Sequence, residues 1–264
     1  MNNINQKHEF QKNWIALRGI IAQELKRVLR IWRQTLIPPI INITLYFLVF
    51  GNFIGSKIPS IQGYSYMAFL TPGLIMMAII MEAYNGSVFP FFINKFHRNI
   101  EEILVAPVPS AIILLGFTLS SIIRSLSVGL LTAIIAFIFF PIAPQHLGIL
   151  LIAAILASTL FAFIGFTNAV FAKSFEDTSV VPTFILTPLV YLGGVFYSVE
   201  QLPSFWQKIA MLNPITYIID IFRYGFLGTQ GHSSLASLAL LSLLIIMAYL
   251  FNIHLLNKGT RLKS

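Results

Sequence analysis

The sequence contains no cysteine and few charged residues. Of its 264 residues, 10% are Asp, Glu, Lys or Arg and 57% are hydrophobic, whereas about 25% of the residues in soluble domains are charged. The lack of cysteine excludes disulfides and thiolate metal sites, and the five histidines are too scattered to form a metal-binding motif. These shortages together indicate a chain whose solvent is largely lipid.

Nucleotide-binding and hydrolytic motifs are also missing. The patterns G-x-x-x-x-G-K-[ST], H-E-x-x-H and G-x-S-x-G do not occur. The chain therefore has no P-loop with which to bind ATP. Its nine carboxylates include two adjacent pairs, Glu101-Glu102 and Glu176-Asp177, and both fall in connections where solvation explains them. We expect neither catalysis nor a cofactor in this chain.

Apolar segments long enough to cross a bilayer dominate what is present. A spanning helix needs roughly 20 predominantly apolar residues, and six segments qualify. They are Thr35 to Ile54, Tyr64 to Phe91, Ser110 to Phe140, Leu147 to Ala172, Ser179 to Val199 and Ser234 to Leu256. The fold class predicted from this pattern is an all-α, polytopic membrane protein that forms a single transmembrane domain over residues 1–264.

The basic residues set the predicted orientation of these spans. With six spans, both termini and two connecting loops lie on one side, and that side carries 13 of the 17 Lys and Arg residues. Cytoplasmic loops carry such an excess, so both termini are expected in the cytoplasm. The net charge of +8 therefore follows membrane topology, and we expect no nucleic-acid partner.

The segment 14–33, "WIALRGIIAQELKRVLRIWR", is amphipathic. Trp14, Leu17, Ile21 and Leu25 fall within one arc at the 3.6-residue period, with Arg27, Arg30 and Arg33 opposite. The pattern predicts an interfacial helix with its apolar face on the membrane and its cations toward acidic headgroups. The alternative is an amphipathic helix packed on a soluble domain, but little sequence remains to form one.

The loop 93–109 is the most polar segment between spans. Asn99, followed three residues later by Glu102, resembles a helix N-cap with a returning carboxylate, and Pro107 ends the pattern. The sequence predicts a short cytoplasmic helix with an apolar face suited to a partner's groove. The alternative is a solvated connector whose apolar residues rest on the headgroups.

Glu82 and Arg124 are two ionisable residues within predicted spans. Charges at that depth are costly and face a bundle interior or a watery cavity, so each is a candidate for function. Three roles stay open: a structural ion pair, a lining of the translocation path and part of a subunit interface.

Residues 200–228 lie between the fifth and sixth predicted spans and hold two short apolar segments. One follows Pro203, and the other begins at Pro214. Neither is long enough to cross a bilayer, and both are too apolar for water, so we expect an extracellular re-entrant helical hairpin. Within the second segment, Asp220 and Arg223 share one helix face and can neutralise each other. The alternative is that Arg223 alone faces lipid phosphate.

Several of these features together resemble the ABC-2 type permeases, the membrane subunits of bacterial ATP-driven exporters. They are the amphipathic entry helix, the six spans, the first-loop sequence "RNIEEILVAPVP" and the late sequence "NPITYIIDIFRYG". The resemblance covers nearly the whole chain. It implies location in the bacterial inner membrane and a dimer of permeases, expected as a homodimer. It also implies two copies of a separate ATPase subunit, which carry the ATP and Mg²⁺.

The resemblance also assigns roles to particular residues. The first cytoplasmic loop of the family forms a coupling helix that touches the ATPase, which implies that role for Arg98, Asn99, Glu101, Glu102 and Leu104. The late sequence belongs to the hairpin that closes the exit, which implies an extracellular gate that contains Pro214, Tyr217, Asp220 and Arg223.

The substrate stays open between two classes, and the driving force has an alternative. Only Glu82 and Arg124 are charged within the spans, which favours a drug, lipid or other amphiphile over a lipid-linked polysaccharide. A self-sufficient secondary transporter is the alternative function, although no convincing inverted repeat is present. A membrane-embedded enzyme is disfavoured by the few carboxylates and histidines.

Overall fold

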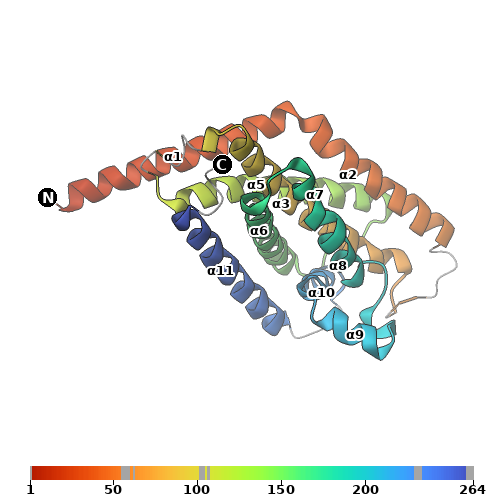
Figure 1. The fold of residues 1–264 in the computed structure, drawn as a ribbon. Coiled ribbons are helices and arrows are strands. Elements are labelled where there is room, and N and C mark those ends of the chain that lie inside the picture. Colours follow the sequence, from red (N-terminus) through yellow and green to blue (C-terminus); the bar gives the residue numbers. More distant parts are fainter. Residues whose placement is uncertain are drawn as a thin grey trace.

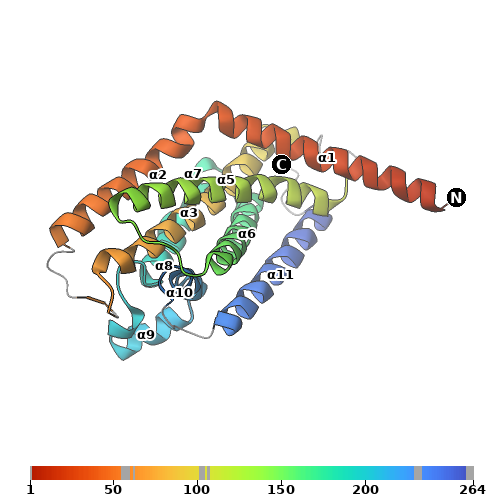
Figure 2. The ribbon, with the colours of Figure 1, turned by 180° about the vertical axis from the view of Figure 1, so that it is seen from behind.

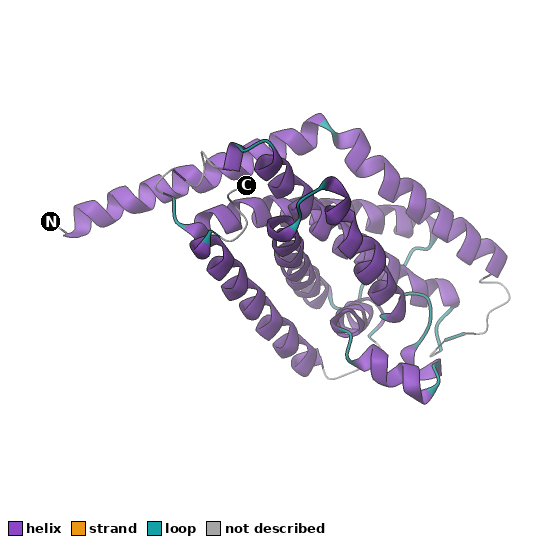
Figure 3. Cartoon of the chain, in the orientation of Figure 1, coloured by secondary structure: helices purple, strands orange, loops and turns teal. Residues whose placement is uncertain are grey.

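The computed structural model describes residues 2–54, 60–61, 63–100, 105, 108–228 and 234–259. Helices account for most of this part of the chain, and its one β-type contact is an isolated bridge between Ile61 and Tyr64 (Figure 3). The helices are α1 (Asn2–Arg30), α2 (Trp32–Tyr46), the π-helix η1 (Phe47–Ile54), α3 (Tyr66–Phe96), α5 (Ser110–Phe139), α6 (Leu147–Phe171), α7 (Phe175–Val181), the π-helix η2 (Pro182–Leu186), α8 (Thr187–Leu192), the 3₁₀-helix η3 (Val199–Gln201), α9 (Ser204–Met211), α10 (Pro214–Leu227) and α11 (Ser234–Lys258). The predicted all-α class is confirmed.

Five helices in the described residues are long and apolar enough to cross a membrane. They cover Trp32–Phe50, Tyr66–Phe96, Ser110–Phe139, Leu147–Phe171 and Leu235–Lys258. The fifth predicted span, 179–199, corresponds to α7, η2 and α8, which follow one another without a gap from Phe175 to Leu192. Pro182 and Pro188 lie within this run, and a proline removes a backbone donor and disturbs the helical ladder. A six-span count therefore stays a prediction.

The helices form a bundle with α3 at its centre, in contact with α5, α6 and α10. Two views from opposite sides show α1 across one end of the bundle and α9 and α10 at the other end (Figures 1 and 2). Helix α10 is seen nearly end-on where α6 and α11 are seen from the side, so α10 runs across those helices. The first part of α1 projects beyond the bundle.

Glycines allow α3 to approach its neighbours closely. A Cβ atom added to Gly165 on α6 would lie 2.5 Å from the Tyr84 carbonyl oxygen of α3, and one added to Gly86 would lie 2.7 Å from Ser121 Oγ of α5. Small residues at such contacts let helix backbones pack tightly, which is how helices associate in lipid. The buried core accordingly follows α3 and includes Tyr84, Phe91 and Phe92.

Helix α1 ends at Arg30, and α2 begins two residues later, at Trp32. The two helices meet at a bend (Figure 1), so the predicted helix 14–33 does not match one element. Helix α1 also packs on protein: a Cβ atom added to Gly116 of α5 would lie 2.7 Å from Ile20 Cγ2. The described part of α1 contains an apolar contact with the bundle and an exposed segment with Trp14 and Ile15.

Candidate functional site

A cavity of about 390 Å³ lies between α2 and α3 and reaches Arg124 of α5. Its lining residues on α3 are Leu74, Met77, Ala78, Met81, Glu82, Asn85 and Phe89, and those on α2 are Gln34, Thr35, Pro38, Pro39, Asn42, Ile43 and Tyr46. Both sets follow the i, i+3, i+4 spacing of a single helix face. The cavity is therefore a groove between one face of α2 and one face of α3.

Polar groups gather in the half of this groove next to α1. Gln34 and Thr35 of α2 lie there with Asn85 and Phe89 of α3, and Glu82 lies at the middle of the groove. The other half is lined by Ile43, Leu74, Met77 and Ala78, together with Asn42 and Tyr46. From Leu74 to Phe89 the groove follows α3 for about 22 Å at 1.5 Å per residue. It is long enough for a chain-like molecule with one polar end.

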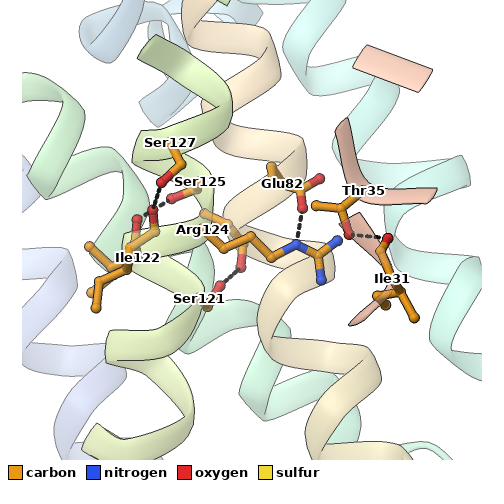
Figure 4. Close-up of polar contacts among 10 residues, drawn as sticks. Ile31, Thr35, Glu82, Ser121, Ile122, Arg124, Ser125 and Ser127 are labelled. Carbon is orange, nitrogen blue, oxygen red and sulfur yellow. Dashed lines mark hydrogen bonds and ion pairs between the residues drawn. The ribbon is translucent and has the colours of Figure 1, made fainter. Parts of the chain in front are cut away.

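Glu82 and Arg124 form an ion pair between α3 and α5. Glu82 Oε1 contacts Arg124 Nε, and their side chains are 10% and 15% exposed, respectively. One terminal guanidinium nitrogen of Arg124 points toward Thr35 of α2, and the other points away from both Glu82 and Thr35 (Figure 4). Ser121 of α5 donates a 2.6 Å hydrogen bond to the carbonyl oxygen of Ala83, which holds the two helices together beside the pair.

Glu24 of α1 is a second buried carboxylate near the pair, and sequence reasoning missed it. Its side chain accepts a 3.5 Å hydrogen bond from Asn94 Nδ2 of α3 and lies 3.6 Å from Arg27 Nη1. Burial raises the pKa of the Glu24 carboxyl above its ordinary value, and the positive charges of Arg27 and Arg124 partly oppose this increase. Glu24, Arg27, Glu82 and Arg124 thus form a cluster with two charges of each sign.

At the other end of the bundle, Asn213 and Pro214 fix the start of α10. The Asn213 side chain accepts a 3.0 Å hydrogen bond from Ile215 N and donates one of 2.6 Å to the carbonyl oxygen of Leu189. Proline at the first helical position costs no backbone bond. Tyr217 donates a 2.8 Å hydrogen bond to the carbonyl oxygen of Met211. Asn213 therefore ties the start of α10 to α8, and Tyr217 ties α10 to α9.

Arg223 is buried within this end of the bundle. Its Nη2 donates a 2.8 Å hydrogen bond to the carbonyl oxygen of Gly194, and its Nε donates one of 3.4 Å to the carbonyl oxygen of Phe69. The guanidinium lies 3.7 Å from the centre of the Phe69 ring, and Nη1 lies 3.6 Å from Asp220 Oδ1. Because Arg223 is only 5% exposed, the alternative in which it faces lipid phosphate alone is wrong.

The base of the loop after α3 is anchored to the end of α6. Lys95 Nζ donates hydrogen bonds of 2.6 and 2.9 Å to the carbonyl oxygens of Val170 and Ala172. Ile100 is buried, whereas Arg98 and Asn99 are exposed, and Arg98 adopts a positive φ of 60°. Glu101, Glu102 and Leu104, the other predicted coupling residues, lie outside the described residues.

The groove had a sequence signal that went unused. Gln34, Thr35 and Asn42 fall on one face of a helix that must cross lipid, and polar residues within spans usually face protein or a cavity. Glu24 lacked such a signal because it lies in a basic amphipathic segment, where a carboxylate is expected to be solvated.

Comparison with known proteins gives matches over most of the chain. Residues 16–227 match the model of the family "ABC-2 type transporter". The chain is 48% identical to the inner membrane transport permease YadH of Escherichia coli strain K12, over 95% of this chain and 98% of that protein. It is 23% identical to nodulation protein J of Neorhizobium galegae, over 93% of each chain. It is 24% identical to nodulation protein J of Sinorhizobium fredii strain NBRC 101917 / NGR234, again over 93% of each.

These matches agree with the helical architecture and the several apolar helices. The Escherichia coli relative is named a transport permease, and none of these relatives' names states a catalytic activity. The family implies partnership with an ABC ATPase subunit. The chain therefore belongs to the ABC-2 type transporter family and is a multi-pass inner-membrane protein with the role of a transport permease.

Proposed function

We propose that this chain is the permease subunit of an ATP-driven exporter and that ATP is hydrolysed on a separate ATPase subunit. The observation that carries the proposal is the family match over residues 16–227 in a chain whose sequence has no P-loop. A permease of this family without its own nucleotide site needs a partner to supply the energy. Two permease copies, forming a homodimer, and two ATPase copies complete the proposed assembly, with both chain termini in the cytoplasm.

The anchored loop after α3 supports a route for mechanical coupling. Lys95 joins the end of α3 to the end of α6, and the rings of Phe96 and Phe175 lie 5.2 Å apart. A partner that pulls on loop 93–109 therefore acts on α3, α6 and α7 together. Because α3 forms one wall of the groove, such a movement changes the groove, as in a rocking transition between two packed states.

The groove favours an amphiphile, such as a drug or lipid, as the exported substrate. It has a volume of about 390 Å³, one polar half and one mainly apolar half, and it contains a single ion pair among its lining residues. A lipid-linked polysaccharide is the other substrate class and requires a wider polar passage. The proposed exit is at the end of the bundle that carries α9 and α10, which we assign as the extracellular re-entrant hairpin.

A self-sufficient secondary transporter is the second candidate. The buried pair of Glu82 and Arg124 favours it, because transporters driven by ion gradients place ionisable residues within the membrane. The exporter requires an ATPase partner, whereas the secondary transporter does not.

The test is affinity purification of the tagged chain from its native cells in a mild detergent that retains lipid, followed by mass spectrometry. We expect a separate P-loop ATPase at near-equal stoichiometry, with hydrolysis that depends on the P-loop lysine of that partner. A second membrane protein purified in parallel controls for non-specific capture. Recovery of a pure permease oligomer, with uptake driven by a proton or sodium gradient in vesicles, would instead establish the secondary transporter.

A further inference from the structure

We infer that Arg124 binds the anionic headgroup of an amphiphile that lies in the groove between α2 and α3, while Glu82 holds Arg124 in place and competes with that headgroup. This inference rests on the proposed permease function, since it names the chemical class of substrate that the groove takes. Phosphate and carboxylate headgroups both have the required charge and oxygen geometry.

The geometry of the ion pair leaves part of Arg124 directed into the groove. Glu82 contacts Nε, Arg124 lines the groove, and one terminal nitrogen points toward Thr35 while the other points away from Glu82 (Figure 4). A guanidinium binds planar or tetrahedral oxyanions through two parallel N–H groups. The edge opposite Nε is thus oriented for an anion that enters from the groove.

Neutral groups beside Arg124 complete the polar half of the groove. Gln34 and Asn85 supply side-chain amides, whereas the Thr35 hydroxyl donates its hydrogen to the carbonyl oxygen of Ile31. Amide N–H groups donate hydrogen bonds to oxyanions. The pair itself is neutral overall, so the groove carries no uncompensated charge when it is empty, which limits the cost of keeping Arg124 within the membrane.

Two exposed arginines lie close in sequence to the polar half of the groove. Arg30 ends α1, and Arg33 lies one residue before Gln34, the first lining residue of α2. Both arginine side chains are exposed. Basic residues at the membrane surface attract anionic headgroups, and charge around the mouth of a cleft raises the local concentration of a ligand of opposite sign. The position of these arginines favours an anionic over a cationic amphiphile.

The other half of the groove suits an alkyl chain. Ile43, Leu74 and Met77 line it, and Met81 lies beside the ion pair in sequence. Methionine is unbranched and adapts to differently shaped apolar ligands. An amphiphile with its headgroup at Arg124 therefore extends its chain along α3, away from α1.

The test uses the permease alone in nanodiscs of zwitterionic phosphatidylcholine, without ATPase or ATP. The probe is an alkyl phosphate that carries a photoactivatable diazirine on its chain, and mass spectrometry locates the labelled residues. Dodecyl phosphate, dodecyltrimethylammonium and inorganic phosphate serve as competitors. We expect labels on the α3 face that contains Met77 and Met81, and competition by dodecyl phosphate alone.

Two single variants give the inference its sharpest test, because it predicts effects of opposite sign. Arg124→Gln should lower labelling about tenfold or more, because a charge-assisted contact is lost. Glu82→Gln should increase labelling, because the competing carboxylate is gone. The double variant Glu82→Gln, Arg124→Gln leaves no unpaired charge and should fold but not label. Ser127→Ala on the exposed side of α5 is the matched control and should label like the parent.

Three results would overturn the inference. In the first, both single variants lose labelling equally while the double variant recovers it, which is the behaviour of a purely structural pair. In the second, the cationic amphiphile competes as well as the anionic one. In the third, inorganic phosphate competes equally, which would make the site one for a free anion. Because no ATPase is present, these results do not depend on whether the ATPase partner of the proposed function exists.

Discussion

Arg223 and Arg124 both lie within the described part of the helical bundle, and their surroundings differ. Arg223 is held by two backbone carbonyl oxygens, an aromatic ring and Asp220 of its own helix. Arg124 is held at one nitrogen by Glu82 of another helix and lines a cavity. An arginine enclosed by fixed backbone acceptors stabilises one arrangement of helices. An arginine that a carboxylate contacts at one nitrogen, beside an open groove, retains donors for another ligand.

The largest expected effect is a loss of stability when Arg223 is replaced, and it distinguishes Arg223 from Arg124. Arg223→Leu removes the donor to the carbonyl oxygens of Gly194 and Phe69 within the bundle. We expect a loss of about 3 to 5 kcal/mol, as for the breaking of a buried charged contact. Thermal unfolding in detergent measures it, with Lys208→Leu on the exposed face of α9 as the control. Unfolding of Arg223→Leu at the parent temperature would show that Arg223 does not fix this end of the bundle.

The second prediction asks whether Arg124 affects transport more than folding. Each of Glu82→Gln and Arg124→Gln leaves one charge in the bundle without its partner. We expect a loss of about 2 kcal/mol, less than for a fully buried pair, because both side chains are partly exposed. The double variant should recover most of this stability, because no lone charge remains, yet transport should stay lost.

Thermal unfolding and transport in proteoliposomes, measured on the same preparations, check the second prediction. Normal transport by the double variant would mean that the pair is structural only, which would remove the distinction between the two arginines.

The third prediction concerns how the ATPase is coupled to the groove that contains Arg124. Replacing Glu101 and Glu102 with Lys reverses two charges in the predicted coupling loop, and we expect the affinity for the ATPase to fall about tenfold with folding unchanged. Co-purification and stimulated hydrolysis measure the effect. Glu200→Lys, at the opposite end of the bundle, is the control. If the doubly substituted chain still binds and stimulates the ATPase like the parent, the coupling assignment is wrong.

The smallest expected effect is a dependence of stability on pH from Glu24, the second carboxylate near Arg124. Burial raises the pKa of Glu24 above its ordinary value of 4.5, while Arg27, Asn94 and Arg124 oppose the increase. The folded state therefore holds this proton more tightly than the unfolded state. The resulting stability is fully present below the unfolded pKa and is lost as pH rises through the folded pKa.

Glu24→Gln should remove this dependence of stability on pH and should stabilise the protein at neutral pH. The gain should be smaller than the stability losses expected for Arg223→Leu and for the Glu82 and Arg124 variants. Unfolding measured across acidic and neutral pH, on the variant and the parent, checks the expectation. Parallel curves for the two proteins would show that Glu24 titrates alike in the folded and unfolded states.

The sequence predicted the helical class because long apolar segments admit few other structures in lipid. The fifth predicted span was harder to predict, since Pro182 and Pro188 divide this helical run into short elements, none of which is long enough by itself to cross a bilayer. Glu82 and Arg124 were identifiable because charges within spans are rare, and the structure joins them in one pair. Their shared depth could not be read from span boundaries that are uncertain by several residues.

The partners of Arg223 could not be predicted, although its helix could. Helical spacing placed Asp220 on the same face. The carbonyl oxygens of Phe69 and Gly194 come from distant segments, and such contacts depend on how helices pack. The groove could not be predicted for the same reason, since its two walls are faces of separate helices and form only when those helices pack together.

The most direct test of the account compares the two sides of α3 during ATP use. The chain has no cysteine, so Asn85→Cys in the groove and Ser87→Cys in the buried core give single labelling sites two residues apart. The rate of labelling by a small water-soluble thiol reagent is measured with the ATPase partner either nucleotide-free or trapped with ATP. We predict a rate at Asn85→Cys that differs between the two states, and no labelling at Ser87→Cys in either. Equal rates at Asn85→Cys in both states would contradict the claim that ATP drives a change in this groove.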